Sequence, residues 1–126
     1  MIDPQKLLNA FNRHGIDYFA GVPDSVLGGL ISHLNSQSNK SINRSAANEG
    51  GAIGLAIGYH ISTSKIPVVY MQNSGLGNAI NPLTSLVDKK VYGIPMILLI
   101  GARGSLGYKD EPQHKKMGPI TLGILK

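Results

Sequence analysis

The chain has 126 residues, of which 42% are hydrophobic and 15% are charged, and this composition indicates a folded domain rather than a disordered segment. Its formal net charge of +5 fits a soluble protein with a modestly positive surface or one that takes a small anionic substrate, whereas the two Phe and the absence of Trp disfavour nucleic acid. The lack of Cys excludes disulfides and thiolate metal sites. We see no signal peptide or membrane-spanning run, and therefore expect a cytoplasmic protein that does not contact membranes.

The chain is predicted to begin with a helix and then to alternate strands with helices. Asp3 and Pro4 favour a helix start, and Gly15 favours its end. The elements expected after it are a strand at 16–22, a helix from Asp24 or Ser25, a weak strand at 38–44, a helix of about four turns from Glu49, strands at 66–72 and 95–102 that flank a helix at 77–93, and a long polar loop that ends in a short apolar element. This order predicts an α/β fold with a parallel open sheet and helices on both faces. Since such sheets usually have more strands, we expect the fold to be incomplete at the C-terminus.

Polar residues suited to chemistry gather where the predicted strands end, in the segments 21–25, 44–49, 72–78 and 101–114. The carboxyl ends of parallel strands share one edge of a sheet, where ligands bind, so these four segments predict one site. No spacing of Asp, Glu and His in them resembles a metal site.

Each part of this predicted site also has a structural interpretation. Asp24 and Ser25 fit as caps of the second helix. Glu49 precedes a run with no Asp, Glu, Lys or Arg up to Lys65, and its helix is predicted to be buried all round; the acid could simply favour the helix N-terminus, which contributes at most about 1 kcal/mol. The segment 72–78 fits a plain turn, and 109–116 fits a solvated charged loop.

Four segments, "GVPDS", "ANEGGAIGLAIGYH", "MQNSGLGNAINPLTSL" and "GYKDEPQHKKMG", occur in an order that resembles the pyrimidine-binding (Pyr) domain of thiamine diphosphate-dependent 2-oxo acid decarboxylases. Among these, the phosphonopyruvate decarboxylases are the most similar, with the alpha subunit of sulfopyruvate decarboxylases close behind. The resemblance implies that residues 1–126 form a partial or small Pyr-type domain. The family's G-D-G motif, which with a later Asn holds Mg²⁺ and the diphosphate, has no counterpart in this sequence. We therefore expect that the diphosphate- and Mg²⁺-binding domain is absent here and that the chain alone is inactive. Leu106 also departs from the family, which has Pro there.

The resemblance assigns roles to individual residues. It implies that Glu49 hydrogen-bonds N1′ of the aminopyrimidine of the cofactor and shares a proton with it, that Asp24 transfers a proton at the reacting carbon, and that His114 is an acid or hydrogen-bond donor. The implied cofactor-binding residues are Gly21, Val22, Pro23, Glu49, Asn73, Ser74, Gly75, Leu76 and Gly77. The implied substrate-binding residues are Asp24, Ser25, Arg103, Lys109, Gln113 and His114, and none is assigned to metal.

The implied reaction converts phosphonopyruvate to phosphonoacetaldehyde and CO2. Sulfopyruvate, another small anionic 2-oxo acid, is the alternative substrate, and a non-catalytic α/β module for binding or assembly is the alternative of a different class. The expected partner is a diphosphate-binding domain or subunit. We also expect a homo- or hetero-oligomer, because a short sheet leaves an unpaired edge and uncovered apolar helix faces.

Overall fold

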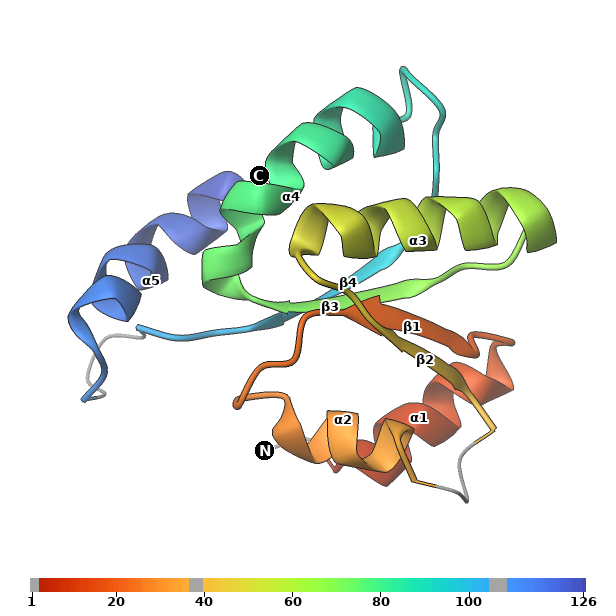
Figure 1. The fold of residues 1–126 in the computed structure, drawn as a ribbon, viewed down its shortest axis with the longest axis horizontal. Coiled ribbons are helices and arrows are strands. Elements are labelled where there is room, and N and C mark those ends of the chain that lie inside the picture. The colour runs from red at the N-terminus through yellow and green to blue at the C-terminus, as the bar shows by residue number, and fades with distance from the viewer. Residues whose placement is uncertain (1–2, 37–39, 105–108) are drawn as a thin grey trace.

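A four-stranded parallel sheet forms the centre of the fold, in the order β2-β1-β3-β4 (Figure 1). The computed structural model describes residues 3–36, 40–104 and 109–126, so Leu106 lies outside the described residues. The strands are β1 (Tyr18–Gly21), β2 (Ile42–Ser45), β3 (Val68–Gln72) and β4 (Ile97–Gly101). The predicted parallel sheet is confirmed, and all four carboxyl ends lie at one edge.

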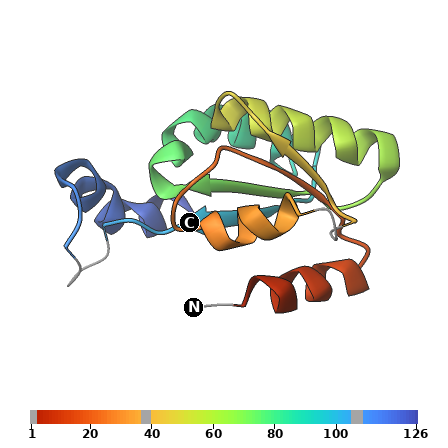
Figure 2. The same cartoon turned by 60° about the horizontal axis from the view of Figure 1, so that its bottom comes forward.

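Helices cover both faces of the sheet, as predicted (Figures 1 and 2). One face is covered by α1 (Pro4–Arg13) and α2 (Gly28–Leu34), and the other by α3 (Glu49–Thr63) and α4 (Leu76–Pro82). A short 3-10 turn, Asn73–Gly75, leads from β3 into α4, and a π-helical segment, Leu83–Val87, continues α4. The last helix, α5 (Pro112–Ile124), lies beyond the carboxyl edge of the sheet, at the left of Figure 1.

Successive strand residues face opposite helical layers, which is why the central strands are apolar throughout. Val68 and Tyr70 pack with α1 and α2, whereas Val69 and Met71 pack with α3 and α4, and all four are fully buried. Gly21 ends β1 against Tyr70, where a Cβ would overlap the carbonyl oxygen and the ring of the tyrosine. Glycine therefore lets β1 and β3 approach closely at the edge that carries the predicted site.

The strands are shorter than predicted or shifted, as in β2, which is expected at 38–44, and three helix boundaries also differ from the prediction. The second helix begins at Gly28, with Leu27 at the cap position and no side-chain cap, so the interpretation of Asp24 and Ser25 as helix caps is wrong. The helix predicted at 77–93 ends at Val87 and is followed by turns. The short apolar element expected at the C-terminus is a helix of 13 residues that begins at Pro112, inside the predicted polar loop.

The α3 helix differs from its prediction in burial. Ala52, Ile53 and Ala56 are fully buried, but Leu55 and Ile61 are 42% and 68% exposed. The helix is thus buried on one face only, and its other face is apolar and open. Its cap is Asn48, whose Oδ1 accepts a hydrogen bond from the Gly51 amide at 2.8 Å, which leaves the Glu49 carboxylate free for another role.

Candidate functional site

Side-chain hydrogen bonds join the segments that follow the strands at the carboxyl edge of the sheet. The loop after β4 reaches the loop after β1 through Arg103, whose Nη1 donates to Ser25 Oγ at 3.0 Å. Helix α4, which follows β3, reaches the start of α3 through Asn78, whose Nδ2 donates to Glu49 Oε2 at 2.8 Å. The Asn73 Nδ2 donates to the Arg103 carbonyl at 2.9 Å and so connects the two pairs. The structure therefore brings together the segments that the sequence predicts to share an edge.

The first part of the site, which we call the Glu49 cluster, consists of Glu49, Gly75 and Asn78. The Glu49 side chain is half-buried and lies directly on Gly75, where a Cβ would overlap the carboxylate. With Oε2 held by Asn78, Oε1 has no hydrogen-bond partner among the described residues. The missing side chain at Gly75 thus makes room for the Glu49 carboxylate itself, and its Oε1 remains able to accept a hydrogen bond from a ligand nitrogen.

Asp24 is the most unusual polar side chain of the site. It is only 7% exposed, and within the described residues neither carboxylate oxygen has a hydrogen-bond partner. Its Oδ2 lies against Gly101, where a Cβ would overlap it. Buried carboxylates are normally paired, so an unpaired one beside a site indicates a group kept for a ligand or for proton transfer.

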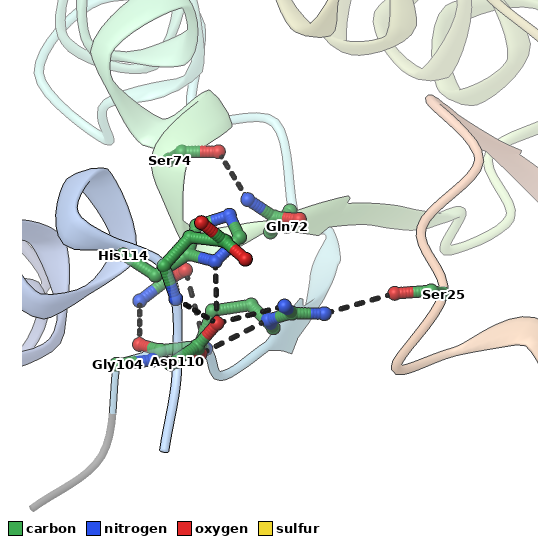
Figure 3. A network of polar contacts seen from close by, with 9 residues as sticks. Ser25, Gln72, Ser74, Gly104, Asp110 and His114 are labelled. Atoms are coloured by element: carbon green, nitrogen blue, oxygen red, sulfur yellow. Dashed lines mark hydrogen bonds and ion pairs between the residues drawn. The ribbon is translucent and has the colours of Figure 1, made fainter. Parts of the chain in front are cut away.

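The second part of the site, the Asp110 cluster, consists of Ser25, Arg103, Gly104, Asp110 and His114 (Figure 3). Arg103 donates to both Asp110 oxygens, from Nε at 3.1 Å and from Nη2 at 2.8 Å. The Gly104 amide donates to Asp110 Oδ2 at 2.8 Å, and Nδ1 of His114 lies 2.7 Å from Asp110 Oδ1. The Asp110 and His114 side chains are 10% and 13% exposed, so this ion-paired group is largely shielded from solvent.

The electrostatics of the Asp110 cluster are set by these donors. The Arg103 guanidinium, followed by His114 and the Gly104 amide, holds the pKa of Asp110 far below its usual range. The same ion pair raises the pKa of Arg103. Asp110 is consequently an ionised hydrogen-bond acceptor at any pH at which the protein would work.

The sequence pattern indicates no role for Asp110 or Asn78, although both lie in the segments predicted at the sheet edge. A run such as 109–116 usually indicates solvated surface, and that interpretation hid the buried Asp110. The signal that could have identified it is the spacing of Asp110 and His114, four residues apart, as on one helix face.

Asn73 has a structural use for its side chain. It is 1% exposed, and its Nδ2 donates to Thr121 Oγ1 at 2.9 Å as well as to the Arg103 carbonyl, while its Oδ1 accepts from the Arg103 amide at 3.3 Å. The amide thereby fixes α5 and the segment after β4 to the segment after β3, and both of its hydrogens are used for this.

The remaining predicted residues are placed as follows. Val22 is half-buried, Leu76 is fully buried in the core, and Pro23, Ser74 and Gly77 are exposed. The Ser74 hydroxyl accepts from Gln72 Nε2 at 2.7 Å (Figure 3). Lys109 and Gln113 are exposed and form no hydrogen bond or ion pair with the described residues, so both side chains are available to a ligand.

Within the part of the chain that the structure describes, no group of three or more His, Cys, Asp and Glu could hold a metal ion. None of the helices in that part is long and apolar enough to cross a bilayer.

Comparisons with known proteins identify the family of the chain. Residues 5–120 match the family described as thiamine pyrophosphate enzyme, N-terminal TPP binding domain. The chain is 38% identical to phosphonopyruvate decarboxylase of Streptomyces viridochromogenes over 125 aligned residues, which make up 99% of this chain and 30% of the relative. It is also 38% identical over 113 residues to sulfopyruvate decarboxylase subunit alpha of Methanococcus maripaludis, which covers 89% of this chain and 64% of the relative.

A solved structure shares the fold. Benzoylformate decarboxylase from Polynucleobacter necessarius superposes with a TM-score of 0.65 at 22% identity, over 82% of this chain and 19% of that one. The chain thus spans less than a third of the phosphonopyruvate decarboxylase and about two thirds of the sulfopyruvate decarboxylase subunit. From the family match over most of its length, the chain belongs to the N-terminal TPP-binding domain family of thiamine pyrophosphate enzymes.

Proposed function

We propose that this chain is the pyrimidine-binding part of a thiamine diphosphate-dependent decarboxylase that converts phosphonopyruvate to phosphonoacetaldehyde and CO2. The family match and the identity to phosphonopyruvate decarboxylases over nearly the whole chain support the reaction class and the substrate. In this proposal residues 1–126 are a Pyr-type domain, and the residues for Mg²⁺ and the diphosphate lie on another domain or subunit.

The observation that carries the proposal is the Glu49 cluster. Asn78 holds one carboxylate oxygen of Glu49, and the absence of a Cβ at Gly75 makes room for the carboxylate in this position. When bound, thiamine diphosphate supplies a nucleophilic carbon and the electron sink for the loss of CO2. Glu49 would hold and exchange a proton at N1′ of its aminopyrimidine through Oε1.

The other loops would act on the substrate. Asp24, buried and unpaired, would move a proton at the reacting carbon, and His114 would donate a hydrogen bond or a proton beside it. Of the two basic residues among the predicted substrate-binding residues, Lys109 is exposed and has no partner among the described residues, whereas Arg103 is already paired with Asp110. Lys109 would therefore contribute most of the charge for the phosphonate, with the remaining N–H groups of Arg103 and the amide of Gln113 as further donors.

Sulfopyruvate is the second candidate substrate. It is favoured by the sulfopyruvate decarboxylase alpha subunits, which are as similar to this chain as the phosphonopyruvate decarboxylases and of which the chain spans a larger share. Both substrates are small 2-oxo acids with an anionic head group, and the same donors would serve either one.

A partner that completes the site is also part of the proposal. Large hydrophobic side chains are exposed on α3, α4 and α5, among them Ile61 at 68% and Leu122 at 70%. An apolar groove of about 280 Å³ lies between α1, α2 and β4, lined by residues such as Leu7, Val26 and Leu99. Such surfaces support association with a diphosphate-binding domain or subunit and a homo- or hetero-oligomer. The cytoplasmic location stays a prediction.

The test is Glu49→Gln in the complete enzyme that contains this chain. Gln keeps the shape and the contact with Asn78 but cannot share a proton, so we expect kcat to fall by about 10²- to 10⁴-fold. Glu111→Gln is the matched control, because it makes the same change at an exposed side chain and should leave kcat unchanged. Unchanged turnover in Glu49→Gln would favour a non-catalytic module, and equal rates on sulfopyruvate would overturn the choice of phosphonopyruvate.

A further inference from the structure

The Asp110 carboxylate is the convergence point of the loop after β4 and the first turn of α5. It is hydrogen-bonded by Arg103 twice, by the amides of Gly104 and Glu111, and by the ring of His114 (Figure 3). This junction is also close-packed, because a Cβ at Gly104 would overlap the backbone of His114. The carboxylate and the His114 ring therefore have little freedom to move apart.

The hydrogen bonds of Asp110 decide which nitrogen of His114 carries a proton. An ionised carboxylate only accepts hydrogen bonds, and Arg103 keeps this one ionised. The ring nitrogen that lies 2.7 Å from Oδ1 must then be the donor, which places a hydrogen on Nδ1 of His114. Among the described residues none forms a hydrogen bond with Nε2, so that nitrogen is left with its lone pair when the ring is neutral.

We propose that Asp110 is the positioning residue of this site: it locks neutral His114 in the Nδ1–H tautomer, so that His114 gains and loses its proton at Nε2 alone. When His114 acts as an acid, the protonated ring releases its Nε2 proton to the bound substrate and returns to the neutral Nδ1–H form. The proton on Nδ1, which faces Asp110, does not move. The same carboxylate aims Arg103 at Ser25, so that one acid orients both basic groups of the cluster. The catalytic part of this inference rests on the proposed function, whereas the tautomer itself does not.

The tautomer is measured directly by long-range ¹H–¹⁵N correlation spectra of the ¹⁵N-labelled chain, at a pH where the ring is neutral. The signals of His114 are identified by their loss in His114→Gln. We expect Nδ1 of the wild type to carry the hydrogen, and we expect Asp110→Asn to shift the hydrogen toward Nε2. Asp17→Asn is the matched control, because Asp17 is also ion-paired and bonded to a second side chain but lies apart from this cluster.

The two parts of the inference fail separately. An Nε2–H tautomer of His114 in the wild type would refute the proposal that Asp110 fixes the Nδ1–H tautomer. This measurement does not depend on the folding of any variant. An unchanged tautomer in a folded Asp110→Asn, judged by circular dichroism, also overturns that proposal. In the complete enzyme, Asp110→Asn should lower kcat by about 10²-fold or more, with a smaller change in KM. A tautomer shift without a loss of kcat would confirm the lock and refute the role of His114 in the proposed reaction.

Discussion

Replacing Asp24 with Ala is expected to stabilise the fold while it impairs the proposed reaction. Both oxygens of this carboxylate are buried and unpaired within the described residues, and a buried polar group without a partner costs about 1–3 kcal/mol. Ala removes this cost, and it loses the attraction to the nearby Arg103 and leaves a small void, which together offset part of the gain. The net expectation is a gain of about 1 kcal/mol, or about 3–6 °C in Tm for a chain of this length.

The assay is thermal unfolding of the chain followed by circular dichroism, together with turnover by the complete enzyme. Asp88→Ala is the control, because Asp88 is exposed and accepts a hydrogen bond from the Lys90 amide, so its loss should lower Tm slightly. A lower Tm for Asp24→Ala than for the wild type would show that the carboxylate is satisfied in the folded state. Undiminished turnover would show that Asp24 is not a catalytic group, since the buried acid would then serve no step of the reaction.

Two further predictions concern the Glu49 cluster and the acid stability of the fold. In Gly75→Ala the added Cβ would displace the Glu49 side chain, which should weaken the binding of thiamine diphosphate by about 10-fold or more and lower the stability of the fold by about 1–3 kcal/mol. Gly58→Ala is the control, because a Cβ at Gly58 meets no atom within 4 Å. Equal binding of thiamine diphosphate in both variants would contradict the contact between Gly75 and Glu49. The hydrogen bond from Lys65 holds the pKa of Asp17 below its usual value. The contribution of this ion pair to stability is therefore complete at pH values above the ordinary pKa of aspartate, and it is lost as the pH falls through the lowered pKa of Asp17. Urea midpoints measured from neutral to acid pH should therefore fall less steeply in Asp17→Asn than in the wild type, and parallel curves would argue against this ion pair.

The strands and their parallel direction could be predicted because the local sequence pattern and the tertiary structure agree. Apolar runs such as 66–72 are what a strand buried on both faces requires. The start of α2 could not be predicted, because Asp24 and Ser25 have the residue types of a cap, but the Ser25 hydroxyl accepts from Arg103 and the Asp24 carboxylate lies against Gly101 instead. Helix α5 was hidden by Gly118 and Pro119, which are unfavourable in an isolated helix. Here the small residue is needed because the helix backbone rests on Gly104, a contact between distant segments that local propensity does not encode.

The shared edge of the four segments could be predicted more fully than the hydrogen bonds among them. A parallel sheet places the ends of its strands at one edge, and Glu49, Asp24, Arg103 and His114 all follow strand ends. Which carboxylate pairs with which base depends on the turn at Gly104, where φ is +73°, and on the direction of α5. Neither follows from residue spacing, so Asp110 was identified only from the structure.

Asn73 gives the sheet an extra rung made by a side chain. Its amide both donates to and accepts from the backbone of Arg103, as a peptide group would, just where the main chain of β3 has already turned away into α4. The hydrogen bonds between β3 and β4 thus continue past the last strand residue, and they restrict the motion of the segments that follow the two strands. A shorter side chain at this position would loosen the segment after β3 from the segment after β4, because both hydrogen bonds between Asn73 and the Arg103 backbone would be lost.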